Sequence, residues 1–138
     1  MCISLFWWEP FYVIIDINFN QLIRPSSPNY YLACPPNRCN IKPNKISNTY
    51  SIPVDTLKKK WQLAIQSEPR FKLVHDDDAD QKTYVQRSFL FRFPDYITVK
   101  FYALGADKST LAILSRSKYG YSDFGVNKSR VNRLLKRL

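Results

Sequence analysis

The chain of 138 residues is poor in the residues from which most metal and redox sites are built. It has one histidine, His75, three cysteines and three glycines. Cys34 and Cys39 are five positions apart, which matches neither the CxxC redox motif nor a zinc knuckle, and no second Cys or His pair completes four ligands. We therefore expect no structural zinc site, and the sequence predicts no other metal and no cofactor.

Recognisable catalytic motifs are missing as well. The sequence shows no phosphate-binding glycine loop, no Ser-His-Asp arrangement and no paired-carboxylate pattern. The acidic run DDDADQ (76–81) is similar to a calcium loop, but Gln81 and Arg87 stand where the EF-hand needs glycine and glutamate, so we interpret it as a solvated turn. One enzyme hypothesis stays open, a thiol-dependent activity at Cys34 or Cys39, and it would need His75 close by.

The segment CPPNRC (34–39) is compatible with two redox states. Two prolines among the four intervening residues allow a tight loop closed by a Cys34–Cys39 disulfide. Such a disulfide would fit an oxidising compartment. Free thiols in a reducing compartment are the alternative.

No apolar run in the chain reaches the roughly 20 residues that span a bilayer. Residues 3–15 are strongly apolar, but Glu9 and Pro10 interrupt them. The segment also lacks the basic region and the small-residue cleavage site of a signal peptide. We interpret residues 1–30 as an apolar segment and extended arm, either a degenerate membrane anchor or a segment packed on the domain. Residues 31–138 are long enough for one domain with its own core.

Acidic residues are scarce, with 11 Asp and Glu against 21 Lys and Arg, for a formal net charge of +10. Residues 115–138 hold seven cations and one acid, which is over half of that excess. Such a region attracts nucleic acid, anionic lipid headgroups or phosphorylated ligands. The alternative is a solvated helix face without a specific partner.

The apolar periodicity predicts an α+β fold. Six of the nine prolines lie between Pro25 and Pro53, so we expect residues 18–53 to be irregular and extended over the surface, with residues 30–32 docked on the domain. A helical stripe follows in VDTLKKKWQLAIQS (54–67), and a second helix is predicted over 126–138.

Four strands are predicted between these helices, over 70–75, 83–93, 96–104 and 110–118. In the second of them the alternation places Val85, Phe89, Phe91 and Phe93 on one face. Short turns favour consecutive antiparallel pairing. The predicted architecture is therefore a four-stranded antiparallel sheet with two helices on one face, in the order α-β-β-β-β-α, preceded by an irregular Pro/Asn-rich N-terminal segment.

The stretch SRSKYGYSDFGVNKSR (115–130) contains two of the three glycines and joins the last strand to the last helix. Gly120 and Gly125 permit the tight connection, and Ser122 or Asp123 is suited to cap the helix. Two interpretations of the remaining polar groups stay open. They form an anion site at the helix N-terminus, or Asp123 pairs with Arg116 or Arg130 and locks the corner.

Arg92 joins this group if it aligns with Arg116 across neighbouring strands, and otherwise pairs with Asp95. The candidate ligand-binding residues are all polar or aromatic groups near that corner: Arg92, Arg116, Tyr119, Tyr121, Ser122, Asp123, Asn127 and Arg130.

Three segments together resemble a family. SRSKYGYSDFGVNKSRVNRL is similar to the C-terminal signature of the bacterial and plastid domain-of-unknown-function family 1499. FRFPDYITVKF resembles that family's central hairpin, and YLACPPNRCN its opening cysteine element, although the order of proline and asparagine differs. The likeness covers about residues 31–138. Its motif positions are Cys34, Asn37, Cys39, Arg92, Asp95, Ser115, Arg116, Gly120, Ser122, Asp123, Gly125, Asn127 and Arg130.

The resemblance implies a small domain, often found in bacteria behind an N-terminal membrane or lipoprotein segment, and it implies no established activity. No lipobox-like run precedes Cys2, so a lipoprotein anchor is not expected. We predict a non-enzymatic domain of the cell envelope that binds an anionic small molecule or lipid headgroup at the strand–helix corner, with a membrane surface as a further partner. The alternatives are the thiol-dependent enzyme and nucleic-acid binding through the basic C-terminal helix.

Overall fold

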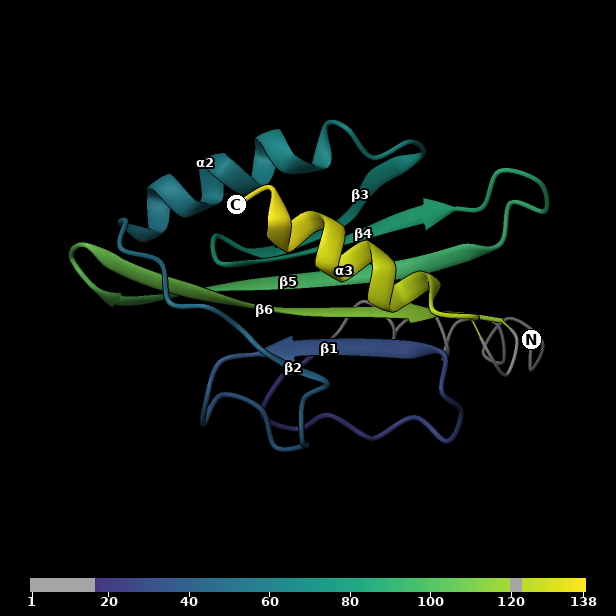
Figure 1. Ribbon diagram of the computed structural model, residues 1–138, viewed down its shortest axis with the longest axis horizontal. Helices are drawn as coiled ribbons and strands as arrows, with labels where there is room; N and C mark the ends of the chain where they lie inside the picture. The colour runs from purple at the N-terminus through teal and green to yellow at the C-terminus, as the bar shows by residue number, and fades with distance from the viewer. Residues whose placement is uncertain (1–16, 120–122) are drawn as a thin grey trace, which may run out of the picture.

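The computed structural model describes residues 17–119 and 123–138 of the chain (Figure 1). This part forms a six-stranded sheet and two helices, in the strand order β2-β1-β6-β5-β4-β3. The strands are β1 (Tyr30–Cys34), β2 (Lys45–Ile46), β3 (Phe71–Asp78), β4 (Gln81–Arg87), β5 (Pro94–Gly105) and β6 (Lys108–Ser117). The helices are α2 (Val54–Ile65) and α3 (Val126–Lys136).

The predicted four-stranded antiparallel sheet is wrong, because the proline-rich segment supplies two further strands. β1 pairs antiparallel with β6, and β2 pairs parallel with β1, so the sheet is mixed. No proline occurs between Pro28 and Pro35. The strand residues there, YYLAC, are mostly good strand formers, and each has a backbone N–H that can pair with a neighbouring strand. The predicted succession of four antiparallel strands between the helices is present as β3 to β6.

The strand predicted over 83–93 is too long, because β4 ends at Arg87. Residues 88–93 form a loop closed by two hydrogen bonds, from Ser88 N–H to the Phe93 carbonyl at 3.0 Å and from Phe93 N–H to Ser88 Oγ at 3.0 Å. Arg92 adopts a left-handed backbone with φ of 57°. The phenylalanines predicted to share one strand face therefore leave the sheet.

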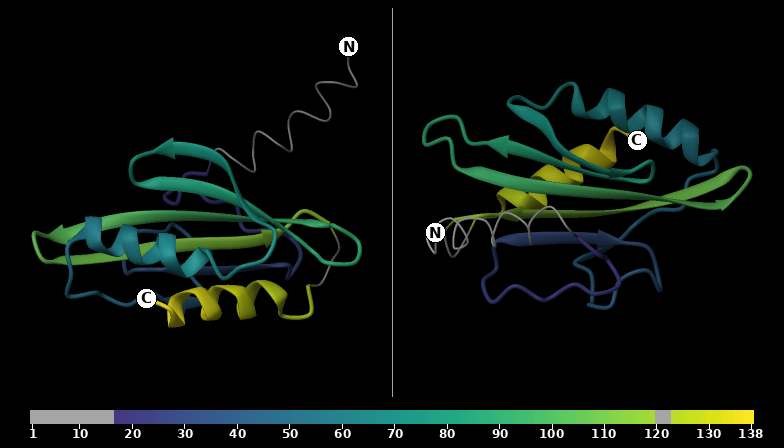
Figure 2. Two further views of the ribbon diagram at one scale, coloured as in Figure 1. Left: turned by 90° about the horizontal axis from the view of Figure 1, so that it is seen from above. Right: turned by 180° about the vertical axis from the view of Figure 1, so that it is seen from behind.

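Both helices cover one face of the sheet, as predicted, and enclose the main core (Figure 2). Leu57 and Trp61 of α2 and Leu134 of α3 are fully buried against alternate residues of the central strands. The Trp61 ring lies edge-on to Phe101, and its Nε1 donates to the Tyr84 hydroxyl over 3.2 Å. This aromatic contact ties α2 to β4 and β5.

The opposite face of the sheet has a smaller apolar cluster. It is covered by residues 17–29, which we call the N-terminal arm. Ile17 and Phe19 of the arm pack on Leu32 of β1 and on Ala112 and Leu114 of β6. In the left view of Figure 2 the purple arm and the helices lie on opposite sides of the sheet. The arm and β1 are thus integral to the sheet, since the arm buries its second face.

We predict that Leu32→Ala lowers the free energy of unfolding by about 2–5 kcal/mol, because it removes a fully buried side chain from this second cluster. Chemical denaturation followed by circular dichroism measures the change. Ile46→Ala is the control, since Ile46 is 56% exposed and its truncation should cost about 0.5 kcal/mol or less. Equal, small effects of both substitutions would show that β1 is the loosely attached segment that its prolines suggested.

Candidate functional site

The corner between β6 and α3 is held by the carboxylate of Asp123. It accepts hydrogen bonds from the backbone N–H of Gly125, the residue before α3, at 2.9 Å and of Asn127, in the first helical turn, at 3.1 Å. Gly125 has φ of 81°, which favours glycine there. Asp123 therefore serves as the predicted cap, while Gly120, Tyr121 and Ser122 lie outside the described residues.

Asn127 is fully buried and all of its amide contacts are internal. Its Nδ2 donates to the Asn29 carbonyl at 3.0 Å and to Asp123 Oδ2 at 2.6 Å. Its Oδ1 accepts from Ser115 Oγ at 2.7 Å. This side chain ties the first turn of α3 to β6 and to the residue that precedes β1.

Arg130 is also buried, at 4% exposure, and its guanidinium group is enclosed by acceptors. Nη2 lies 2.6 Å from Asp95 Oδ2, and Nη1 donates to Asn127 Oδ1 at 2.8 Å and to Ser115 Oγ at 3.0 Å. Nε donates to Gln86 Oε1. Of the two interpretations of this corner, the geometry places Arg130 in an internal network. Its carboxylate partner is Asp95 rather than the predicted Asp123.

A second buried carboxylate extends this network to the other end of α3. Glu68, which follows α2, has a side chain only 1% exposed. Arg133 donates to both of its oxygens, at 2.6 and 3.1 Å, and Arg137 to one at 2.8 Å. Gln86 donates to Glu68 at 3.2 Å and accepts from Arg130, so it links the two halves. We call Gln86, Asp95, Ser115, Asn127 and Arg130, with Glu68, Arg133 and Arg137, the buried polar network.

Sequence reasoning missed Glu68 and Gln86. The one available signal was the spacing of Arg133 and Arg137, which are four residues apart and therefore share a helix face. Nothing in the sequence indicated which carboxylate that face would meet. Three of the five cations between Lys128 and Arg137 (Arg130, Arg133 and Arg137) thus contact carboxylates of their own domain.

Arg116 lies on the other face of the sheet. It follows Ser115 in β6, so its side chain points away from α3, and it stands in register between Tyr30 of β1 and Tyr96 of β5. Of the two alternatives for Arg92, the alignment with Arg116 is not found, because Arg92 lies in the loop 88–93 and Tyr96 takes the position beside Arg116. Asp95, the partner considered in the other alternative, pairs with Arg130. Tyr119 lies at the same end, where its ring contacts Phe93 at 5.9 Å between centroids.

Arg116 lines a pocket of about 240 Å³ between the sheet and the N-terminal arm, which we call the arm pocket. Its walls are largely apolar, with Ile17 and Leu22 from the arm and Leu114 from β6, and Tyr30 completes one side. Burial lowers the pKa of Arg116 to about 10, and the nearby Tyr96 raises it in part. A guanidinium charge therefore stands in a poorly hydrated environment at this pocket.

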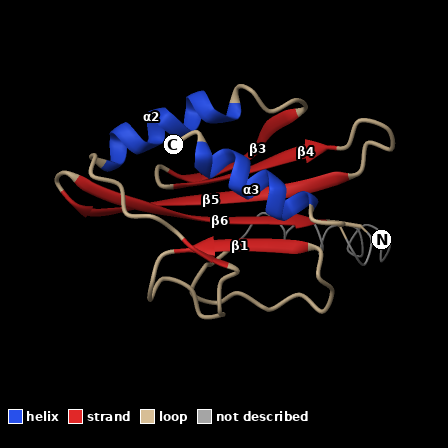
Figure 3. Cartoon of the chain, in the orientation of Figure 1, coloured by secondary structure: helices blue, strands red, loops and turns tan. Residues whose placement is uncertain are grey.

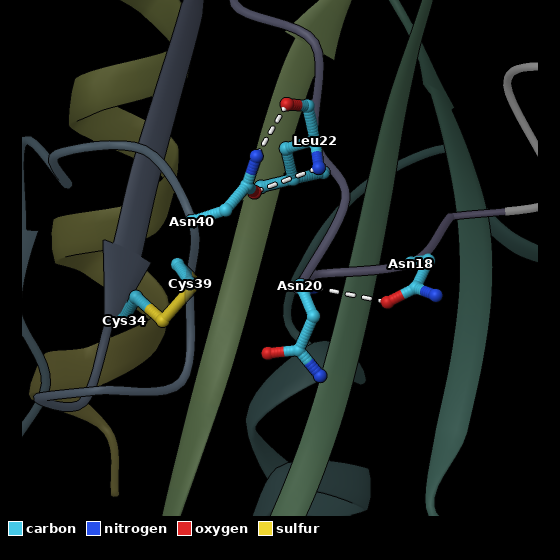
Figure 4. Close-up of a disulfide and its surroundings, with 6 residues drawn as sticks. All are labelled: Asn18, Asn20, Leu22, Cys34, Cys39 and Asn40. Carbon is cyan, nitrogen blue, oxygen red and sulfur yellow. Dashed lines mark hydrogen bonds between the residues drawn. A yellow bond between two sulfur atoms is a disulfide. The ribbon is translucent and has the colours of Figure 1, made fainter.

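The disulfide between Cys34 and Cys39 stands beside the same arm (Figure 4). Asn40, the next residue, receives a hydrogen bond from Leu22 N–H at 2.7 Å and donates one to the Leu22 carbonyl at 2.9 Å. The Asn40 side chain thus pairs with both backbone groups of Leu22, as the backbone of a neighbouring strand does. The disulfide loop therefore positions one wall of the arm pocket.

The described residues contain no Cys–His pair arranged for the thiol-dependent activity. The sulfurs of Cys34 and Cys39 are bonded to each other, so neither is a resting nucleophile. His75 is on β3, four strands away from β1, a separation of roughly 19 Å, and its Nε2 lies 2.8 Å from Asp77. Within residues 17–119 and 123–138 no group of His, Cys, Asp or Glu is arranged to hold a metal ion. None of the helices described there has the length and apolarity to cross a membrane.

A family model described as "Protein of unknown function (DUF1499)" matches residues 24–138. The chain belongs to the DUF1499 family. The predicted resemblance is confirmed, and the match begins seven residues earlier than the resemblance suggested. Searches of curated proteins and of solved structures give no significant match.

The motif positions of this DUF1499 domain fall on two sides of the sheet. Asp95, Ser115, Asn127 and Arg130 meet in the buried polar network, where they hold α3 in place. Arg116, next to Ser115 in the chain, lines the arm pocket instead. Adjacent residues of β6 therefore have different roles: Ser115 belongs to the buried polar network, and Arg116 lines the arm pocket.

We predict that Arg130→Ala lowers the free energy of unfolding by about 3–5 kcal/mol, because it leaves the carboxylate of Asp95 buried without its cation. Urea denaturation measures this loss. Lys128→Ala, on the exposed side of the same helix, removes the same charge and should change stability by less than about 0.5 kcal/mol. A similar small effect for both variants would contradict the structural role assigned to Arg130.

The network also predicts a pH dependence through Glu68. Burial alone would raise the pKa of Glu68, but hydrogen bonds from Arg133, Arg137 and Gln86 outweigh it and lower the pKa from 4.5 to about 2. Because the folded-state pKa is the lower one, the stabilisation is complete above the unfolded-state value and is lost as pH falls through about 2. The difference in free energy of unfolding between the parent and Glu68→Gln should therefore be largest above pH 5 and shrink toward pH 2. A difference that stays constant over this range would contradict the assignment.

Proposed function

We propose that this DUF1499 domain is a non-enzymatic binding module whose arm pocket takes a small phosphate ester, with Arg116 as the group that recognises the anion. The proposal moves the predicted anion site from the strand–helix corner to the opposite face of the sheet. The observation that carries it is the position of Arg116, a partly buried guanidinium at the wall of a largely apolar pocket.

The electrostatics of the pocket favour an anion. Burial lowers the pKa of Arg116, which means that its charged form is less stable there than in water. A phosphate in the pocket would favour the charged form, because charge-assisted hydrogen bonds to its oxygens are stronger than neutral ones. Arginine also matches the geometry of phosphate through two parallel N–H donors.

The size and the walls of the pocket restrict the ligand further. A volume of about 240 Å³ is below the 300–1,000 Å³ typical of sites for drug-sized ligands, so it suits a compact group. Its apolar walls favour an anion that carries a short hydrocarbon part. A phospholipid headgroup with the adjoining glycerol and a phosphorylated metabolite both have this chemistry.

The cell envelope is the compartment that we propose for this module. The support is the Cys34–Cys39 disulfide, because disulfides persist in oxidising compartments and are rare in the cytosol. The disulfide loop also positions Leu22 at the pocket through Asn40, so an oxidising environment would keep the pocket wall in place.

The nucleic-acid alternative is less well supported by the arrangement of the basic helix. Arg130, Arg133 and Arg137 contact Asp95 and Glu68 within the domain, so their charges are largely offset there. Lys128 and Lys136 remain on the exposed face of α3. Two lysines give few phosphate contacts compared with the six to ten of a typical DNA-binding surface.

Calorimetric titration tests the function with two ligands, glycerol 3-phosphate as the free ester and dihexanoyl phosphatidylglycerol as the lipid. We predict binding of at least one, and a preference between them identifies the source of the anion. Arg116→Ala should weaken binding about tenfold or more, because a hydrogen bond to a charged group contributes about 1.5–3 kcal/mol.

Arg38→Ala provides the matched control, since it removes one surface cation from the disulfide loop and none from the pocket. It should bind both ligands as the parent does. The proposal is wrong if neither ligand binds the parent protein, or if Arg116→Ala and Arg38→Ala have the same affinity.

A further inference from the structure

The loop between β4 and β5, residues 88–93, exposes the most prominent apolar group of the described surface. Phe89 is 75% exposed, Leu90 73%, Phe91 67% and Phe93 54%. These four large side chains lie within five positions, in contrast to the isolated exposed apolar residues that every soluble domain has. A contiguous exposed apolar group of this kind commonly marks an interaction site.

This loop has a defined structure. Beyond the two bonds between Ser88 and Phe93, Arg87 donates to the Arg92 carbonyl at 2.9 Å, and Arg70 donates to the Arg87 carbonyl at 2.9 Å. These bonds close the base of the loop and leave its apolar side chains outside. Figure 1 shows the loop projecting beyond the end of the sheet, and the right view of Figure 2 shows the same projection from behind.

The aromatic rings of the loop contact one another and the end of β6. Phe91 stacks on Phe93 with 5.5 Å between ring centroids, and Phe93 contacts Tyr119 at 5.9 Å. The exposed group is therefore a continuous aromatic surface that ends in a tyrosine hydroxyl. Aromatic residues with one polar end are the ones enriched at membrane–water interfaces.

Cations surround this aromatic surface. Arg70 lies over the Phe89 ring at 5.6 Å and Lys118 over the Tyr119 ring at 5.4 Å. Arg87 and Arg92 belong to the loop and its base, and residues 79–94 contain only one acid, Asp80, at the far end of β4. The nearest carboxylate that follows, Asp95, is bound to Arg130. The end of the sheet thus combines apolar rings with several cations.

We propose that the 88–93 loop inserts into the interface of an anionic lipid bilayer and docks the domain on it. The aromatic rings would enter the headgroup and acyl boundary, while the surrounding cations would stay at the charged surface, where each contributes about 1 kcal/mol of attraction to anionic lipid. The charge of this surface is complementary to that partner. This inference goes beyond the proposed function and stands without it, because no residue of the loop lines the arm pocket.

A bilayer fits this surface better than a protein does. Stable protein interfaces bury about 800 Å² on each partner. Four partly exposed side chains on a six-residue loop supply roughly 400–700 Å², since an aromatic side chain buries 150–250 Å² when it is fully covered. A protruding tip is also convex, and a bilayer accepts a convex apolar tip without a shaped groove.

The test is co-sedimentation of the full chain with vesicles of phosphatidylcholine alone and of phosphatidylcholine with phosphatidylglycerol. We expect the parent to bind the anionic vesicles, more weakly at high salt because the charges are screened. Phe89→Ser/Phe91→Ser should lower the partition coefficient about tenfold or more, since two large apolar side chains no longer enter the membrane. Thermal unfolding of this variant should match the parent, because both side chains are exposed.

Leu63→Ser/Leu73→Ser is the matched control, since these residues are 65% and 51% exposed and lie on α2 and β3. It should bind the anionic vesicles as the parent does. Failure of the parent to bind phosphatidylglycerol vesicles overturns the proposal, and so does equal binding by the loop and control variants. Self-association of the parent that the loop variant lacks would also overturn it and assign the loop to a second copy of the chain.

Discussion

The structure depends on the burial of one charged side chain, Arg130. Removing a guanidinium group from water costs several kcal/mol unless its donors are satisfied, so its acceptors must be held in place. They come from β4, β5, β6 and α3 itself, through Gln86, Asp95, Ser115 and Asn127. The direction in which α3 crosses the sheet is consequently fixed by polar contacts as well as by Val131 and Leu134.

This network decides which polar groups are available to a ligand. The corner at the start of α3 has the composition of an anion site, but its capping carboxylate and buried amide satisfy the nearby donors from within. Arg116 leaves the corner only because strand residues alternate between the two faces of a sheet. The arm pocket and the buried polar network thus lie on opposite faces of the sheet at β6. A substitution in one need not disturb the other.

The sequence was informative where periodicity alone determines structure. The stripe that includes Leu57 and Trp61 predicted α2, and the alternation of Ile97, Val99 and Phe101 predicted the buried face of β5. It was misleading where one pattern has two meanings. The alternating phenylalanines after Arg87 follow a strand period, yet nothing local shows that β5 starts at Pro94 and leaves them without a partner strand.

Long-range pairing explains the remaining errors. β1 stands between prolines and was expected to be irregular, and only its pairing with β6, 80 or more residues later, makes it a strand. The partner of Arg130 could not be chosen from sequence either. Asp123 was considered for it and Asp95 only for Arg92, because the register of β5 and the position of α3 were not known. Of the residues assigned to the corner, Asp123, Asn127 and Arg130 meet in space. Arg116 lines the arm pocket on the other face instead.

The central claim is that the buried polar network is structural and that the anion site lies on the other face of the sheet. Backbone amide chemical shifts, followed by NMR during titration with glycerol 3-phosphate, test this division most directly. The account predicts that the changes centre on Leu22, Tyr30 and Arg116, around the arm pocket. Changes centred instead on Gly125, Asn127 and Arg130 would place the anion at the N-terminus of α3 and contradict it.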